Sequence, residues 1–328
     1  MFVSTRKARR LEWQDVAPRN EEQADAWEIA NRNQARFSAA FSRTIRSVID
    51  ESSRQRLFNA LVAGDLNGAI NAFPWLNEGD EASVAIWSAY TEGLRRAYSD
   101  VLAQGATAAL EEIPAPFEFI SKVIGVTPTG GGTRGLIGLE VPFSQVPFSE
   151  RWIEAQAARL VVSVSDTQRT MLRDLILRMF SEGRPPREML EQIERVVGLT
   201  PRDAQAVANR EALLIGQGVT VSKRTTALDR YSKQLLRRRG QNIARTELIS
   251  AQSQGITDAW RIAKQEGFIA SSALEEWIAS RGPRTCKICI GLDGQQVPVG
   301  EPFTSELIGL IERPPAHPSC RCTRILVQ

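Results

Sequence analysis

The four cysteines and the single histidine of this chain all lie between positions 286 and 322. They form the pattern C-x2-C-x27-H-x2-C-x-C, whose members are Cys286, Cys289, His317, Cys320 and Cys322. Residues used only for packing would be scattered along the chain, so this clustering indicates one shared role. Thiolate and imidazole are ligands that zinc prefers, and a C-x2-C turn presents two sulfurs to one ion. The cluster therefore predicts a module folded around a structural zinc ion.

The cluster offers five donors for the four places of a tetrahedral site. Four thiolates could fill these places, with His317 as a hydrogen-bond partner outside the ligand set. Alternatively, His317 and Cys320 mirror the spacing of the first cysteine pair and bind together with it. Disulfides are the competing interpretation, and they would require Cys286 and Cys289 to face Cys320 and Cys322. The sequence leaves these alternatives open.

A metal bound here would be structural, because four protein ligands leave no open position for water. No HExxH motif and no second histidine is present to build a catalytic site. The zinc deaminase pattern is also absent, since Ser319 stands where that pattern has its glutamate and the order of the motifs is reversed. We therefore expect no small-molecule substrate.

The composition is that of a folded globular protein with two domains, with 42% hydrophobic and 24% charged residues in 328 positions. The net charge of +3 is too small to indicate nucleic-acid binding by itself. The sequence shows no signal-peptide pattern and no run of 18 apolar residues. We expect a protein of the cytosol that neither is secreted nor spans a membrane.

Residues 1–112 are predicted to form a helical N-terminal domain after a loose basic arm. Apolar residues recur at three- and four-residue steps from Ala24 onward, which predicts a first long helix. Three further helices are expected before Ile113, one of them capped by Asp65. Aromatic residues at this spacing, such as Trp27 and Trp87, are interpreted as core rather than as ligand contacts.

Residues 113–150 are rich in proline and glycine and are predicted to be a linker or a long loop, with a strand or hairpin between Leu136 and Phe143. The Gly130–Gly132 run lacks the G-K-[ST] sequence of a phosphate-binding loop. Residues 151–265 return to helical patterns. One helix is expected to start at Thr200-Pro201, and a long helix from Ser222 is either continuous or broken at Gly240.

The long helix carries two features of possible functional interest. Arg230, Lys233 and Arg237 share one side of it, which indicates either a solvated face or contacts with phosphates or an acidic partner. Arg245 and Glu247 precede a track of small residues that would let a neighbouring helix approach closely. Buried helix charges are more often structural than catalytic, and we interpret this pair as structural.

Residues 266–328 are predicted to be a small module of short strands, with Trp277 in the first strand and residues 324–327 in the last. A core this small needs a cross-link to fold, and metal binding would supply it. The predicted fold is mainly α, with two helical domains and a small C-terminal α+β module stapled by zinc.

An ordered set of motifs in the second half of the chain resembles the phage Mu F-like head morphogenesis proteins, also called minor head or minor capsid proteins. The set consists of Ala244-Arg245-Thr246-Glu247, Trp277, Thr285-Cys286-Lys287-Ile288-Cys289, Leu292-Asp293-Gly294 and His317-Pro318-Ser319-Cys320-Arg321-Cys322. At Ser280-Arg281-Gly282-Pro283 the sequence departs from the family, in which an acidic residue is common. The resemblance starts near Trp152 and does not extend to residues 1–112.

The resemblance implies a tailed-phage protein that joins the head beside the portal during assembly and aids packaging or delivery of the genome. Its partners would be the portal or the major capsid protein, with packaged DNA as a further candidate, and its location would be the virion after assembly in the host cytoplasm. Two other hypotheses stay open: an enzyme such as a nuclease or transferase that uses Glu247 with nearby arginines, and a non-specific nucleic-acid binder.

Overall fold

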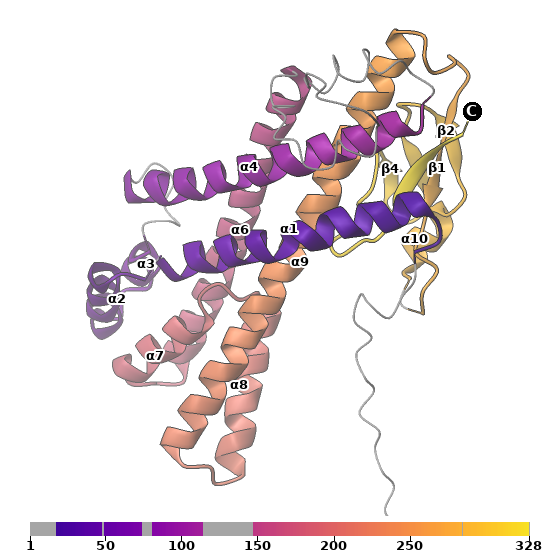
Figure 1. The fold of residues 1–328 in the computed structure, drawn as a ribbon. Coiled ribbons are helices and arrows are strands. Elements are labelled where there is room, and N and C mark those ends of the chain that lie inside the picture. The colour runs from indigo at the N-terminus through magenta and orange to yellow at the C-terminus, as the bar shows by residue number, and fades with distance from the viewer. Residues whose placement is uncertain (1–17, 48, 74–80, 114–146, 284, 328) are drawn as a thin grey trace, which may run out of the picture. The chain divides into compact units, whose positions relative to one another are not determined.

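The computed structural model describes residues 18–47, 49–73, 81–113, 147–283 and 285–327, and it is mainly helical with a small antiparallel sheet near the C-terminus (Figure 1). The predicted fold class is therefore confirmed. The helices are α1 (Glu21–Ser47), α2 (Glu51–Ala63), α3 (Leu66–Asn71), α4 (Glu81–Glu111), α6 (Pro147–Ser181), α7 (Pro186–Val196), α8 (Pro201–Gly216), α9 (Val221–Gln265) and α10 (Lys287–Leu292). The strands are β1 (Leu274–Ile278), β2 (Gln296–Pro298), β3 (Phe303–Ser305), β4 (Gly309–Ile311) and β5 (Thr323–Val327).

Side-chain caps start several helices where the sequence predicts them. The carboxylate of Asp65 accepts a hydrogen bond from Gly68 N at 2.9 Å and begins α3. The hydroxyl of Thr200 accepts one from Asp203 N at 3.1 Å, with Pro201 at the first position of α8. These bonds satisfy N–H groups that have no partner within the helix, so local sequence chemistry decides where each helix begins.

Helix α9 is continuous from Val221 to Gln265, which settles the choice left open at Gly240. A Cβ atom at Gly240 would lie 2.9 Å from Ser38 Oγ and 3.2 Å from the ring of Phe41. The glycine therefore permits close packing against α1 and does not end the helix. Helix propagation over the flanking residues outweighs the modest cost of one internal glycine.

The chain divides into two compact units, and each unit combines segments that are not consecutive in sequence. We call residues 32–100 and 143–248 the helical unit, and residues 1–31, 101–142 and 249–328 the cysteine unit. The predicted ranges 1–112, 151–265 and 266–328 stay predictions. Most of the predicted linker, residues 114–146 with its strand or hairpin, lies outside the described residues.

The helical unit packs around apolar side chains and a buried hydrogen-bond network at the turn between α7 and α8. The fully buried side chain of Gln168 accepts a hydrogen bond from Gly198 N at 2.7 Å and donates one to Leu199 O at 2.6 Å. Arg239 of α9 donates to Gly198 O at 2.6 Å. Because these polar groups of the turn have partners, the turn can be buried at little cost.

In the cysteine unit, the C-terminal part of α9 carries the predicted track of small residues. A Cβ atom at Gly255 would lie 2.0 Å from Leu102 O of α4, and one at Gly105 would lie 2.4 Å from Gln252 O. These distances leave no room for a side chain at either position. The two helices therefore approach each other at their glycines, as the track predicts.

Strand β1 is the centre of a three-stranded antiparallel sheet in the order β2-β1-β5, and β3 and β4 form a separate hairpin. The sequence predicts β1 and β5 correctly. It places a turn at the first cysteine pair and no helix, and the structure shows that Lys287–Leu292 forms the short helix α10 there. The cause is local: the thiol of Cys286 caps this helix by accepting the N–H of Cys289 at 3.4 Å.

Candidate metal centre

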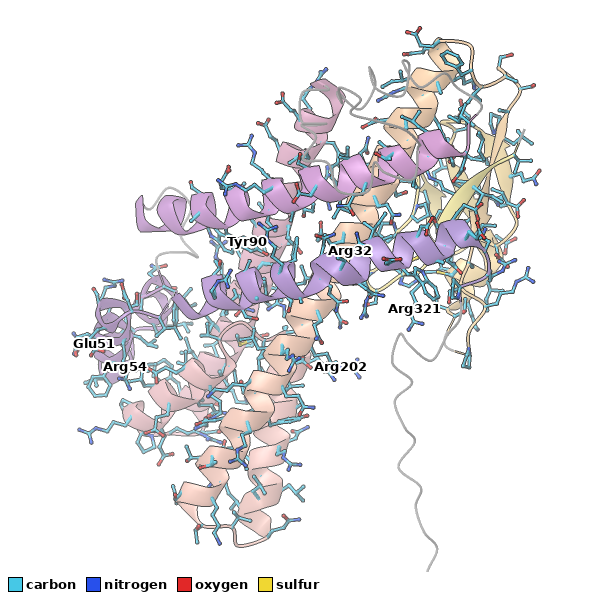
Figure 2. All side chains as sticks on the ribbon, in the orientation of Figure 1. Arg32, Glu51, Arg54, Tyr90, Arg202 and Arg321 are labelled. Carbon is cyan, nitrogen blue, oxygen red and sulfur yellow. The ribbon has the colours of Figure 1, made fainter. Side chains whose placement is uncertain are left out.

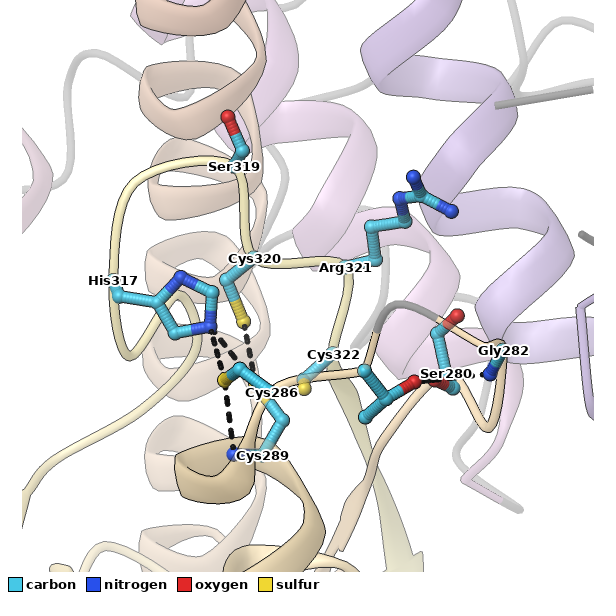
Figure 3. Close-up of a pocket in the computed structure, with 10 residues that line it drawn as sticks. Ser280, Gly282, Cys286, Cys289, His317, Ser319, Cys320, Arg321 and Cys322 are labelled. Carbon is cyan, nitrogen blue, oxygen red and sulfur yellow. Dashed lines mark hydrogen bonds between the residues drawn. The ribbon is translucent and has the colours of Figure 1, made fainter. Parts of the chain in front are cut away.

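The first cysteine pair is held by α10 and the loop before it. Cys286 is the N-cap of α10 and Cys289 lies in its first turn, so the two side chains project to the same side (Figure 3). In the preceding loop, the hydroxyl of Thr285 donates to Ser280 O and accepts from Gly282 N. These hydrogen bonds tie Thr285, the residue before Cys286, to the segment that follows β1.

The returning donors lie on a tight turn from His317 to Cys320. Cys320 N donates to His317 O at 3.1 Å, with Pro318 and Ser319 between them. Ser319 has φ of 63°, a left-handed conformation that is costly for residues with a side chain. Proline at the second position and a left-handed third residue are typical of a type II turn, which here orients His317 and Cys320 toward the first pair.

All five predicted donors converge in space. His317 Nε2 lies 3.1 Å from Cys286 Sγ and 3.0 Å from Cys289 Sγ, and Cys289 Sγ lies 3.7 Å from Cys320 Sγ. The donors form two overlapping groups that share Cys289: one with Cys286 and His317, the other with Cys320 and Cys322. They line a cavity of about 70 Å³ (Figure 3). The cluster could therefore hold a metal ion.

These distances fit a tetrahedral site with small adjustments. Zn–S bonds of about 2.3 Å and Zn–N bonds of about 2.0 Å place ligand atoms about 3.5 to 3.8 Å apart. The sulfur–sulfur distance of 3.7 Å is in this range, and the two sulfur–nitrogen distances are about 0.5 Å shorter. The cysteines are free thiols, so the disulfide alternative is not what the structure contains.

The orientation of His317 favours it as a ligand. Its Nδ1 lies 2.9 Å from the carbonyl oxygen of Pro318, which can only accept a hydrogen bond. Nδ1 therefore carries the proton, and Nε2 presents its lone pair to Cys286 and Cys289. This arrangement, in which one ring nitrogen donates to a carbonyl and the other faces the metal, is the usual state of a metal-binding histidine.

The thiols share their protons within the cluster. Hydrogen bonds from the side chains of Cys289 and Cys322, together with the N–H groups of Cys322 and Ala316, lower the pKa of Cys320 well below its usual value. Hydrogen bonding to Cys320 and Cys322, followed by burial, raises the pKa of Cys289. A lowered pKa favours the thiolate form of Cys320, which is the form of cysteine that binds a cation.

Trp277 supplies the apolar wall of the cluster, which gives this predicted motif residue a structural role. It is fully buried and packs against Phe303 in an edge-to-face arrangement with 5.1 Å between ring centres. The same core contains Ala279 and Leu292 together with three of the cysteines, which are Cys289, Cys320 and Cys322. A core of so few side chains contributes little burial energy without a cross-link.

The Leu-Asp-Gly motif ties α10 to the end of β1. Asp293 accepts hydrogen bonds from Ala279 N at 2.9 Å and from Arg281 Nε at 2.6 Å, and it also pairs with Arg19. Burial opposes ionisation, but the Ala279 N–H and the two guanidinium groups outweigh it and lower the pKa of Asp293. Gly294 follows with φ of 79° and donates to Trp277 O at 2.8 Å. The motif thus positions the C-x2-C turn beside β1.

The sequence gives no indication of a further set of contacts, made by the start of α1. Trp27 Nε1 donates to Arg321 O at 3.1 Å, and Gln23 Nε2 donates to the same oxygen at 3.3 Å. Figure 2 shows Arg321 beside this end of α1. Trp27 is predicted to be core and is indeed buried, but its indole N–H also binds the segment between Cys320 and Cys322. No periodicity could reveal a contact with a backbone carbonyl so far along the chain.

Arg245 and Glu247 lie in the helical unit, and Glu247 takes part in a buried polar cluster. Its Oε2 accepts hydrogen bonds from Tyr98 Oη at 2.6 Å and from Gln156 Nε2 at 2.8 Å. Burial raises the pKa of Glu247, and these two hydrogen bonds oppose part of the increase. The partners of Glu247 come from α4 and α6, so this residue connects three helices.

The predicted basic face is present on α9. Arg230, Lys233 and Arg237 are all exposed, and among the described residues no ion pair involves any of the three. The one acidic residue of this stretch, Asp229, pairs instead with Arg195 at 2.9 Å. The three cations are therefore available to a partner.

Comparison with known proteins finds a family resemblance in the second part of the chain. Residues 214–325 match the family described as Phage Mu protein F like protein. No curated protein and no solved structure gives a significant match. None of the described helices is long and apolar enough to cross a membrane. The matched residues include Arg245, Glu247, β1 and all five donors of the cluster, so the part of the chain that carries the candidate metal centre is similar to this family.

Proposed function

We propose that this chain is a minor head protein of a tailed phage, which docks on the portal or the major capsid protein during head assembly and aids packaging or delivery of the genome. The observation that carries the proposal is the family match over residues 214–325, whose end contains the complete donor cluster. In this proposal the protein resides in the virion, at the portal or inside the head. It acts as a structural and interaction protein and not as an enzyme.

The donor cluster is proposed to bind one structural zinc ion through four of its five donors, which are Cys286, Cys289, His317, Cys320 and Cys322. Three or four thiolates favour zinc over the harder divalent cations, and full protein ligation leaves no site for a reacting water. The zinc ion would supply a cross-link to the thin core around Trp277. The lone pair of His317 Nε2 supports this residue as one of the four ligands.

Metal analysis of the purified full chain tests the zinc site, with one equivalent of zinc per chain as the expected result. His317→Ala should weaken zinc binding in a chelator competition, since it removes a ligand. Undiminished affinity in this variant would exclude His317 from the ligand set and favour four cysteines. A chain that binds no zinc under reducing conditions would contradict the zinc proposal itself.

Co-expression with the portal and capsid proteins of the same phage tests the docking proposal. The wild-type chain should sediment with assembled heads or with isolated portals. Cys289→Ser should reduce this association because it disrupts the module, whereas Ser271→Ala, at an exposed position of the same module, should not. Association with neither component would refute the proposal, and a portal gene beside the gene for this chain would support it.

A second candidate function is contact with nucleic acid, favoured by the exposed side chains of Arg230, Lys233 and Arg237. Binding through phosphates depends strongly on salt, because each contact releases counterions. Replacement of the three residues by glutamine should therefore weaken DNA binding and reduce the slope of affinity against salt concentration by roughly one unit per contact. Equal DNA binding by wild type and variant would show that this surface only faces solvent and does not contact DNA.

The enzyme hypothesis has weaker support. The carboxylate of Glu247 is buried and bound by Tyr98 and Gln156, which favours a structural role. In nuclease and transferase assays, wild type and Glu247→Gln should give the same result, because the substitution should remove no activity. Activity that disappears in the variant would reverse this assignment.

A further inference from the structure

The first turns of α1 contact both halves of the donor cluster. The donors come from two segments, residues 286–289 and residues 317–322, and the chain between them includes strands β2, β3 and β4. Arg19, Gln23 and Trp27 follow one another at four-residue steps, so their side chains lie along one side of the chain as it enters and forms α1. All of these residues belong to the cysteine unit.

Arg19 contacts residues on either side of the first donor segment, residues 286–289. Its guanidinium donates to Ala279 O at 3.1 Å and pairs with Asp293, the residue that follows α10. Asp293 also binds the backbone N–H of Ala279. Arg19 thereby connects α1 to the end of β1 and to the helix that carries Cys286 and Cys289.

Gln23 and Trp27 bind the second donor segment, residues 317–322. Both donate to the carbonyl oxygen of Arg321, at 3.3 Å and 3.1 Å, and this oxygen lies between Cys320 and Cys322. Gln23 is fully buried, and its Oε1 accepts the N–H of Arg19 at 2.9 Å, so its orientation is itself determined. Two donors on one carbonyl restrict the rotation of the peptide that spaces the two cysteines.

We infer that Arg19, Gln23 and Trp27 are positioning residues of the metal site, and that metal binding and docking of the start of α1 are thermodynamically linked. The inference rests on the proposed metal site. A ligand set preorganised by α1 binds metal more tightly, because less conformational freedom is lost on binding. Linkage is reciprocal, so metal must in turn strengthen the docking of α1 to the same degree. The docking of residues 19–31 would thus depend on the state of the metal.

Zinc affinity of the full chain, measured by chelator competition, tests the positioning role. Trp27→Phe removes the indole N–H and keeps an aromatic ring, and Gln23→Leu removes the amide at similar size. Each should weaken zinc binding by about threefold to tenfold, the effect of one hydrogen bond, and the double variant by more. Trp152→Phe is the matched control, since Trp152 packs against Tyr98 in the helical unit. The zinc affinity of this variant should equal that of wild type.

Cobalt absorption spectra separate positioning from a general loss of stability. In the two single variants the visible bands of bound Co²⁺ should shift or broaden, because the Cys320–Cys322 segment is less constrained, while Trp152→Phe should reproduce the wild-type spectrum. Unchanged affinity and unchanged spectra in Gln23→Leu, Trp27→Phe and the double variant would overturn the inference.

Hydrogen exchange on the wild-type chain tests the linkage without any variant. Backbone amides of residues 21–31 should exchange faster after chelation, and re-addition of zinc should restore their protection. Equal exchange of these amides with and without zinc would overturn the inference. This test stays decisive even if one of the variants does not fold, because it uses only the wild-type chain. A wild-type chain that binds neither zinc nor cobalt would instead refute the metal site on which the inference rests, so the two failures are distinguishable.

Discussion

The metal module, residues 266–328, and the helical unit bury polar groups by different means. In the helical unit, Gln168 and Arg239 bind the backbone of the turn between α7 and α8, and Glu247 accepts from Tyr98 of a neighbouring helix, within an apolar core that is already formed. In the metal module, the buried core around Trp277 contains three thiols that have mainly one another as partners. Helices can thus be held by packing with a few polar contacts, whereas the buried donors of the module are arranged so that they could hold an ion.

Removal of metal should give the largest difference between the two regions. Structural zinc sites contribute on the order of 10 to 16 kcal/mol of apparent binding free energy at neutral pH. Chelation should therefore abolish exchange protection in β1 and β5 and leave α7 and α8 protected. Hydrogen exchange with mass spectrometry checks this, and equal loss of protection in both regions would show that they do not differ as described.

Arg324→Met should give the next largest effect, within the cysteine unit. Arg324 and Glu275 form a fully buried ion pair, and Arg324 also donates to Ser253 O at 2.7 Å. Removing one partner of a buried pair typically costs about 3 to 5 kcal/mol, because the other charge stays buried without compensation. Urea unfolding monitored in β1 measures the loss. Glu276→Gln on the same strand is the control, since Glu276 is less buried, and a similar loss there would argue against the ion pair.

Substitutions at the Glu247 cluster should cause a smaller loss in the free energy of unfolding, and this loss should be in the helical unit. Tyr98→Phe removes one hydrogen bond to a buried carboxylate and should cost about 1 to 3 kcal/mol, measured by urea unfolding. The raised pKa of Glu247 also predicts a pH dependence. The folded state binds this proton more tightly than the unfolded state does, so the contribution of Glu247 is fully present below its unfolded pKa and is lost as pH rises through its raised folded pKa.

Glu247→Gln should remove that pH dependence, because the amide does not titrate. The variant should gain stability relative to wild type as pH rises, measured as the difference in urea midpoints across the acidic to neutral range. Glu154→Gln, at an exposed position on α6, should keep the wild-type profile. A difference between Glu247→Gln and wild type that does not change with pH would contradict the raised pKa.

Ser319→Gly should produce the smallest effect, and it should be stabilising. Ser319 has a left-handed conformation that costs roughly 1 kcal/mol for a residue with a Cβ, and glycine relieves this cost but is more flexible when unfolded. The free energy of unfolding of the zinc-loaded module should rise by at most about 1 kcal/mol. Ser319→Val, which tolerates this conformation poorly, should destabilise the turn instead, and the reverse order would refute the assigned conformation.

Much of the candidate site could be predicted from residues alone. Soft donors at C-x2-C and H-x2-C-x-C spacing indicate a shared ligand set, because few other roles require them together. The helices with side-chain caps at Asp65 and Thr200 were also predictable, since a cap acts within three residues of its own position. Helix α10 was missed because a thiol is an uncommon cap.

The sequence by itself determined which residues can bind a metal and which segments are helical, because ligand chemistry and helical periodicity are local properties. Only the tertiary structure decided that the start of α1 binds the segment between Cys320 and Cys322, and that α9 continues through Gly240. The contacts of Gln23 and Trp27 end on the backbone carbonyl of Arg321, and every residue has such a carbonyl. A partner without a side-chain signature can be recognised only when the folded chain brings the two groups together.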